Sequence, residues 1–173
     1  MTKHVDPQLS CDEVKNALEY RAADGVLIWK IKPRPSIRVG AVAGHKRSNF
    51  ITLNIFGKRT RAHRLIWFMH HGEWPDGEID HINCNPLDNR IENLRIANRS
   101  QNAANCKNGR VGKSGHMNVW KTRNGRFMAC VKTITGGFKS YGTYDSVEEA
   151  ASVVKDAHIG IHGHFSKFAA IPQ

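Results

Sequence analysis

The residues best suited to chemistry lie between Glu78 and Asn105. Asp80 and His81 fall near the end of a short β-prone run, and Leu94-Arg95-Ile96 begins a second run after a loop rich in Asn and Asp. Two such runs joined by a polar loop predict a β-hairpin. We therefore expect one strand to deliver Asp80 and His81 together.

The chain after the second run carries the start signal of a helix. Asn98 is a favourable N-cap residue, and Gln101 stands three residues later, which is an Asn-headed variant of the capping box. A helix that begins there places Asn102 in its first turn. Two strands and a helix are thus expected to converge on Asp80, His81, Asn93 and Asn102.

These side chains favour metal-assisted hydrolysis of a phosphate ester. Carboxylate and amide oxygens are hard ligands for Mg²⁺, which also binds substrate phosphates. A neutral His beside them can take a proton from water near neutral pH. The alternative is a hairpin whose Asn and Asp serve only the turn. Turn formation, however, does not require a His after Asp80 or an Asn at position 102.

The Asp80-His81 pair, Asn93 and Asn102 closely resemble the HNH nucleases of the ββα-metal group, in the branch whose last His is replaced by Asn. The flanking runs Asp88-Asn89-Arg90 and Glu92-Asn93-Leu94-Arg95 share this resemblance. It implies that His81 is the general base and that Asp80 and Asn102 hold Mg²⁺, for which Mn²⁺ can substitute. It also implies that Asn93 orients His81 or braces the loop.

His63 and Arg64 start an apolar run that precedes the motif. In a functional interpretation they face the scissile phosphate, where Arg64 stabilises charge and His63 assists. In a structural interpretation they are a helix-start His and a solvated Arg.

The composition favours a nucleic-acid partner. The formal net charge is +11 and the pI is about 9.8, so the surface gains from counterion release on a polyanion. No stretch approaches the apolar length of a spanning helix, and the N-terminus lacks the apolar core of a signal peptide. We expect a protein that is not secreted and acts in the cytoplasm, or at the host nucleoid if a phage encodes it.

The four cysteines, Cys11, Cys84, Cys106 and Cys130, include no CxxC pair, which favours reduced thiols over a Cys₄ zinc site. Cys84 and Cys106 flank the motif and could meet at a metal, which is a second interpretation.

The region before the motif predicts a small antiparallel β platform. A capping box at Ser10 and Glu13 predicts a helix over 11–20, and Asp24-Gly25 turns it into a strand over 26–31. Further strands are expected within 40–44 and 50–55, followed by a hairpin turn at 56–58 and a strand over 59–62. A buried helix over 63–70 should end at Gly72. The platform also resembles the N-terminal part of phage-type HNH proteins.

The last third of the chain predicts a three-stranded sheet covered by one helix. Strands are expected over 118–121, 126–133 and 137–143, and a capping box at Ser146 and Glu149 begins the helix. Alternation assigns one set of side chains to the covered face: Val119, Phe127, Ala129, Val131 and Tyr141. It assigns another set to the open face: Trp120, Arg126, Met128, Cys130, Lys132 and Ser140.

This block, from about residue 115 to 168, resembles the Apetala-two, or ethylene-response-factor, DNA-binding domain, which also occurs fused to phage HNH nucleases. The runs NGRFMACV, SYGTYDSVEEAA and HGHFSKF carry the resemblance. It implies that the sheet enters a DNA major groove. The expected DNA-binding residues are Trp120, Arg123, Arg126, Lys132 and Lys139. Cys130 and Ser140 depart from the plant pattern, in which charged or aromatic side chains are expected.

The sequence therefore predicts an α+β protein in three parts: a β-rich platform over 1–62, an HNH core over 63–106, and a DNA-binding domain over 115–173 after a basic linker over 107–114. The expected function is homing-type, metal-dependent cleavage of double-stranded DNA by nicking or double-strand cutting. A non-enzymatic DNA-binding regulator is the alternative. RNA is a third possible partner, but its narrow major groove does not admit a sheet.

Overall fold

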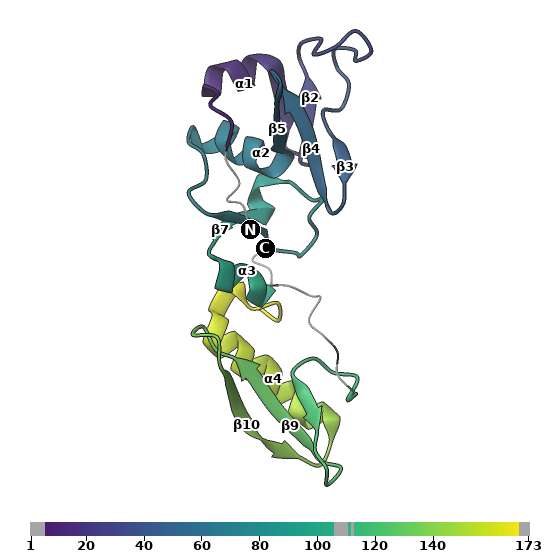
Figure 1. The fold of residues 1–173 in the computed structure, drawn as a ribbon, viewed down its shortest axis with the longest axis vertical. Coiled ribbons are helices and arrows are strands. Elements are labelled where there is room, and N and C mark those ends of the chain that lie inside the picture. The colour runs from purple at the N-terminus through teal and green to yellow at the C-terminus, as the bar shows by residue number, and fades with distance from the viewer. Residues whose placement is uncertain (1–5, 106–110, 112, 170–173) are drawn as a thin grey trace. The chain divides into compact units, whose positions relative to one another are not determined.

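The computed structural model describes residues 6–105, 111 and 113–169, and it has the mixed α+β architecture that the sequence predicts. The chain divides into two compact units, residues 1–97 and 98–173, which are described separately (Figure 1). This division falls at the end of the expected hairpin, before the helix that carries Asn102. Most of the basic linker expected at 107–114, together with Cys106, lies outside the described residues.

The first unit opens with a short helix and a hairpin. Helix α1 (Cys11–Ala17) begins at a complete Ser10–Glu13 capping box, as predicted. The expected extension of this helix to residue 20 is wrong, because the chain leaves it as strand β1 (Leu18–Arg21) and pairs with strand β2 (Val26–Trp29). Tertiary pairing with β2 outweighs the weak local preference of these residues for a helix.

The platform is a three-stranded antiparallel sheet in the order β3-β4-β5. Strands β4 (Phe50–Ile55) and β5 (Lys58–Arg61) form the predicted hairpin through the turn at Phe56 and Gly57, whose φ angles are 49° and 77°. The strand expected over 40–44 is reduced to a single bridge between Ile28 and Val42. Strand β3 (His45–Arg47) forms just after it and pairs with β4.

Helix α2 (Ala62–His71) is the central element of the first core. It ends at Gly72, which takes the left-handed conformation at φ 80° and donates its N–H to the Phe68 carbonyl, as predicted. Leu65 and Ile66 are fully buried in a core that also contains residues of α1, β2 and β4. The helix thereby connects the platform to the hairpin that follows.

That hairpin pairs β6 (Glu78–His81) with β7 (Leu94–Ala97), as predicted. The connection contains a short 3-10 helix, η1 (Ile91–Asn93). Asp80 and His81 thus stand at the end of β6, beside the point where β7 begins.

The second unit begins with α3 (Arg99–Asn105), which carries the predicted cap. Asn98 Oδ1 accepts the Gln101 N–H at 2.9 Å, and Gln101 Oε1 accepts the Asn98 N–H at 2.8 Å. The backbone N–H of Asn102 donates to Asn98 O, which places Asn102 at the end of the first turn.

The rest of this unit is the predicted sheet of β8 (Val119–Lys121), β9 (Phe127–Lys132) and β10 (Phe138–Tyr144), packed on α4 (Val147–His162) and followed by η2 (Gly163–Phe165). The predicted covered face is confirmed, because Val119, Ala129 and Val131 are buried against Ala150 and Val154 of the helix.

Trp120 and Lys132 point to the opposite face, and 51% of Trp120 is exposed. Cys130 shares this open face but is only 8% exposed.

None of the helices in the described parts of the chain has the length and apolar character needed to cross a bilayer.

Candidate active site

His81 is held by a buried amide, Asn89, for which the motif predicts no role. His81 is 6% exposed, and its Nε2 lies 3.0 Å from Oδ1 of Asn89, which is 2% exposed. An amide oxygen can only accept, so Nε2 is the donor and Nδ1 is the basic nitrogen of the neutral ring. This contact therefore fixes the tautomer and the orientation of the ring.

The surroundings of His81 keep its imidazole neutral. Burial lowers its pKa below the usual 6.5, and this effect outweighs the bond to Asn89 and the charges of Asp80 and Asp88, which raise the pKa. A neutral ring at pH 7 is ready to accept a proton. Burial thus produces the protonation state that base catalysis requires.

Asp80 lies beside His81 and pairs with Arg95 across the hairpin. Asp80 and Arg95 are directly opposed in the β6–β7 register, and Arg95 Nε and Nη2 approach Asp80 Oδ2 at 2.8 and 2.7 Å. Asp80 is 5% exposed, so the Arg95 cation offsets a buried negative charge. The carboxylate is the type of hard oxygen donor that Mg²⁺ prefers.

Within the described residues, no group of three or more His, Cys, Asp or Glu side chains is arranged to hold a metal ion. The ligand pair expected from the sequence is of another type, because it joins one carboxylate with the amide of Asn102. Asn102 lies on α3 in the second unit. Its meeting with Asp80 at a metal stays a prediction.

Asn93 makes the contacts of a loop brace. Its Oδ1 accepts the backbone N–H of Asn83 at 3.0 Å, and its Nδ2 donates to Asn83 Oδ1 at 3.1 Å and to the Asp88 carbonyl at 2.7 Å. Of the two roles expected for Asn93, these bonds support bracing of the loop. The bond to His81 comes instead from Asn89.

Asp88 organises the same loop from the other side. Its carboxylate accepts from Asn83 Nδ2 at 2.7 Å and from Arg90 Nε and Nη2 at 2.9 and 2.8 Å. The bond to Arg90 is the main reason that the pKa of Asp88 falls to about 2. The loop therefore keeps this charged bridge throughout the neutral and mildly acidic range.

His63 lies edge-on to His81 inside the unit. The two ring centroids are 5.2 Å apart with an interplanar angle of 88°, and Phe50 meets His63 from another direction at 5.5 Å. His63 is 2% exposed, so it lies within the core behind His81. A direct part for His63 in the chemistry stays a prediction.

Arg64 is bound on all three guanidinium nitrogens by the protein itself. Nε and Nη2 bind the Asp6 carboxylate, Nη1 donates to the Gly77 carbonyl at 2.8 Å, and Nη2 also donates to the Pro75 carbonyl at 2.9 Å. These contacts tie the N-terminal segment to the turn before β6. The expected role of Arg64 beside a phosphate stays a prediction, and its observed contacts are structural.

The β1–β2 hairpin supports the loop that carries Asn89. Tyr20 Oη accepts the Ile91 N–H at 2.9 Å. Gly25, at φ +69°, approaches so closely that an added Cβ would lie 2.5 Å from the Asn89 carbonyl carbon. Only glycine accommodates both the left-handed conformation and the close approach. These contacts span more than sixty positions of sequence, so no local pattern could have predicted them.

This contact predicts an unequal cost for two glycine substitutions. Gly57→Ala, at φ +77° with open space around it, should cost about 1 kcal/mol of unfolding free energy through backbone strain alone. Gly25→Ala adds the clash with the Asn89 backbone and should cost a further 1–3 kcal/mol, roughly. Urea unfolding of both variants checks this. Equal losses would show that the loop yields freely to the added methyl group.

The expected DNA-binding residues lie on the C-terminal unit in varied settings. Arg123 and Trp120 are exposed, whereas Arg126 Nε pairs with Asp145 at 2.7 Å and its Nη2 donates to the Thr143 carbonyl. Lys139 is paired with Val131, which places it on the helix side of the sheet. Contact of these residues with DNA stays a prediction.

Comparison with known proteins identifies the region around His81. Residues 60–104 match the family model described as HNH endonuclease. The chain is also similar to Protein 3.8 of Escherichia phage T7, with 29% identity over 114 residues that cover 65% of this chain and 93% of the relative. No solved structure matches the chain significantly. The described hairpin from β6 to β7 lies within the matched region, and an HNH domain implies a nuclease that acts on DNA.

Proposed function

We propose that this chain is a divalent-metal-dependent, homing-type DNA endonuclease in which His81 is the general base. The observation that supports this most directly is the buried Nε2 contact of His81 with Asn89, which orients the imidazole at the strand end that also carries Asp80. This arrangement lies inside the segment that matches the HNH endonuclease model. A DNA-binding regulator has no physical need for it.

In the proposed reaction, His81 Nδ1 takes a proton from water, and the water oxygen attacks the phosphorus of the scissile diester. The P–O3′ bond breaks, and the 3′ oxygen leaves with its electron pair and gains a proton from solvent. The products carry a 5′-phosphate and a 3′-hydroxyl. Arg95 balances the charge of Asp80 until substrate binds, and Asn93 keeps the loop in shape.

We assign the metal to Asp80 and Asn102, with Mg²⁺ as the ion and Mn²⁺ as a substitute. When bound, it supplies Lewis-acid stabilisation of the charge on the phosphate oxygens. Hard oxygen ligands and few protein groups suit Mg²⁺, which shares its coordination shell with substrate and water.

Cleavage of supercoiled plasmid tests the proposal. Purified protein with Mg²⁺ should convert supercoiled DNA to open-circular or linear forms, and chelation of the metal should abolish this. Ligation of the products without further treatment would confirm the 5′-phosphate and 3′-hydroxyl ends. A protein that binds the plasmid but leaves it intact with Mg²⁺ and with Mn²⁺ would be the regulator instead.

We further propose that the open face of the C-terminal sheet contacts double-stranded DNA. This face presents Trp120 and Lys132, and its opposite face is the packed core on α4. A strand pair or sheet of this kind fits the major groove. Trp120 supplies exposed apolar surface, and Lys132 supplies a cation for a phosphate.

Substitutions on this face should weaken binding without unfolding the unit. Lys132→Ala should lower the slope of log affinity against log salt concentration by about one, the value for one lost phosphate contact. Trp120→Ala should lower affinity while the thermal unfolding midpoint stays unchanged. Fluorescence anisotropy with a labelled duplex measures the affinity of each variant, and a thermal melt measures its unfolding midpoint. Lys155→Ala on α4 is the control. If the affinity were unchanged in both variants, DNA would bind to a different surface of the protein.

A further inference from the structure

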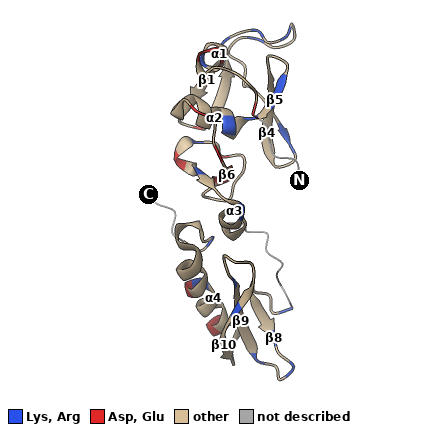
Figure 2. Ribbon diagram, turned by 60° about the vertical axis from the view of Figure 1, so that its left-hand side comes forward, with Lys and Arg blue, Asp and Glu red and all other residues tan. Residues whose placement is uncertain are grey.

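Positive charge is segregated within the first unit. Between Gly25 and Gly72 the sequence contains no Asp or Glu. The same stretch carries a series of basic side chains: Lys30, Lys32, Arg34, Arg38, Lys46, Arg47, Lys58, Arg59, Arg61 and Arg64. In Figure 2, strands β3 and β5 and the adjoining loop carry blue (Lys and Arg) and no red (Asp and Glu). A domain with a purely structural role would not need to exclude acidic residues from this stretch.

The strand register gathers several of these cations on one face of the platform sheet. Directly opposed residues of an antiparallel pair point to the same side. Arg47 opposes Phe50, and Arg59 and Arg61 oppose Asn54 and Thr52. All three arginines therefore share one face.

The other face of this sheet is the core face. Leu53, Ile55 and Thr60 occupy it, and each is at most 2% exposed. On the arginine face, Arg47 and Arg59 are exposed and Arg61 is half-buried, with its guanidinium 4.6 Å over the Phe50 ring.

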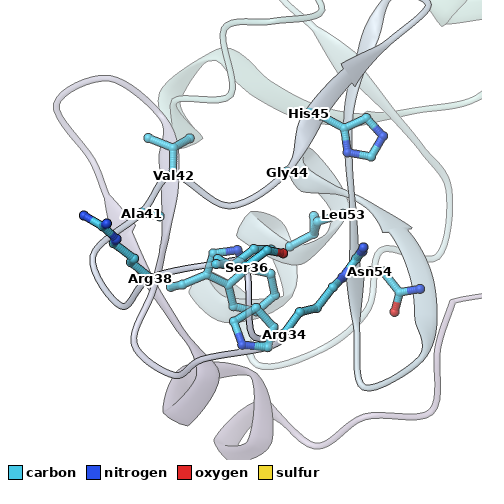
Figure 3. Close-up of a pocket in the computed structure, with 12 residues that line it drawn as sticks. Arg34, Ser36, Arg38, Ala41, Val42, Gly44, His45, Leu53 and Asn54 are labelled. Carbon is cyan, nitrogen blue, oxygen red and sulfur yellow. The ribbon is translucent and has the colours of Figure 1, made fainter.

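A hollow beside this sheet, lined by a mixture of apolar and polar side chains, adds two further arginines to the surface. Its volume is about 570 Å³, and its lining includes Arg34 and Arg38 from the loop after β2, His45 from β3 and Asn54 from β4. Figure 3 shows these side chains around the opening, with Arg38 directed outward. No acidic residue lines the hollow. It is large enough for a phosphate group and part of a sugar.

Three arginines of this surface have no carboxylate partner among the residues that the structure describes. Other arginines of the chain, such as Arg21, Arg90 and Arg95, form ion pairs with nearby carboxylates. Within the described part of the chain, Arg34, Arg47 and Arg59 make no such pair. Cations held close together repel one another, and a polyanion relieves this repulsion while releasing its counterions.

We propose that the open face of the β3-β4-β5 sheet, together with Arg34 of the adjoining loop, binds the phosphate backbone of duplex DNA. The inference rests on the proposed function for its substrate and adds a surface on the nuclease unit itself. DNA is then held by residues of the first unit as well as by the C-terminal sheet. Phosphate contacts of this kind position the duplex and carry no sequence information.

The test uses the full chain with Arg34→Gln, Arg47→Gln and Arg59→Gln combined. Binding to a labelled duplex is followed by anisotropy across a salt titration, with chelator present so that no cleavage occurs. Three lost phosphate contacts should lower the salt slope by about 2.7, so the wild-type fall in affinity between 50 and 200 mM salt should shrink by roughly 40-fold. The control removes equal charge elsewhere through Lys15→Gln, Arg21→Gln and Lys155→Gln.

A folded triple variant, judged by circular dichroism, that keeps the wild-type salt slope would overturn the proposal. So would a triple variant that loses binding to phosphatidylserine vesicles but keeps its DNA slope, because the face would then be a membrane contact. Cleavage is scored separately with wild-type protein. If the wild-type protein binds DNA through this face but does not cleave it, the proposed nuclease function is wrong and the proposed DNA-binding surface is still supported.

Discussion

His81→Ala should reduce cleavage by at least about 10²-fold while leaving affinity for duplex DNA unchanged. The substitution removes the imidazole that Asn89 binds, and a positioned general base contributes about 10²–10⁴-fold to a rate. The loss should appear in the cleavage rate constant measured with protein in saturating excess over DNA. Single-turnover cleavage with Mg²⁺ and anisotropy without metal measure the two quantities.

Two further variants separate loss of the base from loss of the fold. His81→Gln fills more of the buried space and keeps a polar group beside Asn89, yet it cannot take the proton, so it should be equally slow. His70→Ala removes an exposed imidazole at the end of α2 and should cleave at the wild-type rate. Wild-type rates in both His81 variants would assign the base elsewhere.

Asn89→Ala should slow cleavage by roughly 10²-fold, because the ring loses the acceptor that fixes its tautomer and orientation. Asn89→Asp keeps an acceptor oxygen at the same place and should recover much of this loss. Asn85→Ala changes an exposed amide of the same loop and should have little effect. Affinity for DNA should be similar in all three proteins.

The pH profile distinguishes orientation of His81 from general damage to the loop. Burial lowers the pKa of His81 below 6.5, so the wild-type rate should rise with pH along a limb centred below 6.5. A carboxylate in place of Asn89 favours the imidazolium and should move this limb to higher pH. Asn89→Ala removes a bond that raises the pKa and should move it lower. Unshifted limbs in both variants would reduce Asn89 to a loop-packing role.

Most elements of the fold could be predicted because their signals are local. Capping boxes at Ser10 and Asn98, the Gly72 stop and the alternation in β8 and β9 all act within a few residues, and each was confirmed. The failures lie at 18–20 and 40–44, where pairing with β2 decides the conformation. Local propensity is weak there, and cross-strand pairing rather than the preference of single residues decides the conformation.

The site was predictable to a lesser degree. The motif placed Asp80 and His81 together on one strand end, and the hairpin does so. It did not distinguish Asn89 from Asn93 as the partner of His81, because several amides crowd one irregular loop whose path depends on hydrogen bonds. The contacts of Arg64 with Asp6 could not be predicted from the sequence either, because they join residues 58 positions apart.

The approach of Gly25 and Tyr20 to the loop has a consequence for protein engineering. The segment that matches the family model begins at residue 60, so it includes neither Tyr20 nor Gly25. A cassette of residues 60–104 transplanted into another scaffold would carry every side chain of the motif but lack the surface against which Asn89 is shaped. A portable version of the proposed nuclease has to include the β1–β2 hairpin or a designed replacement for its turn.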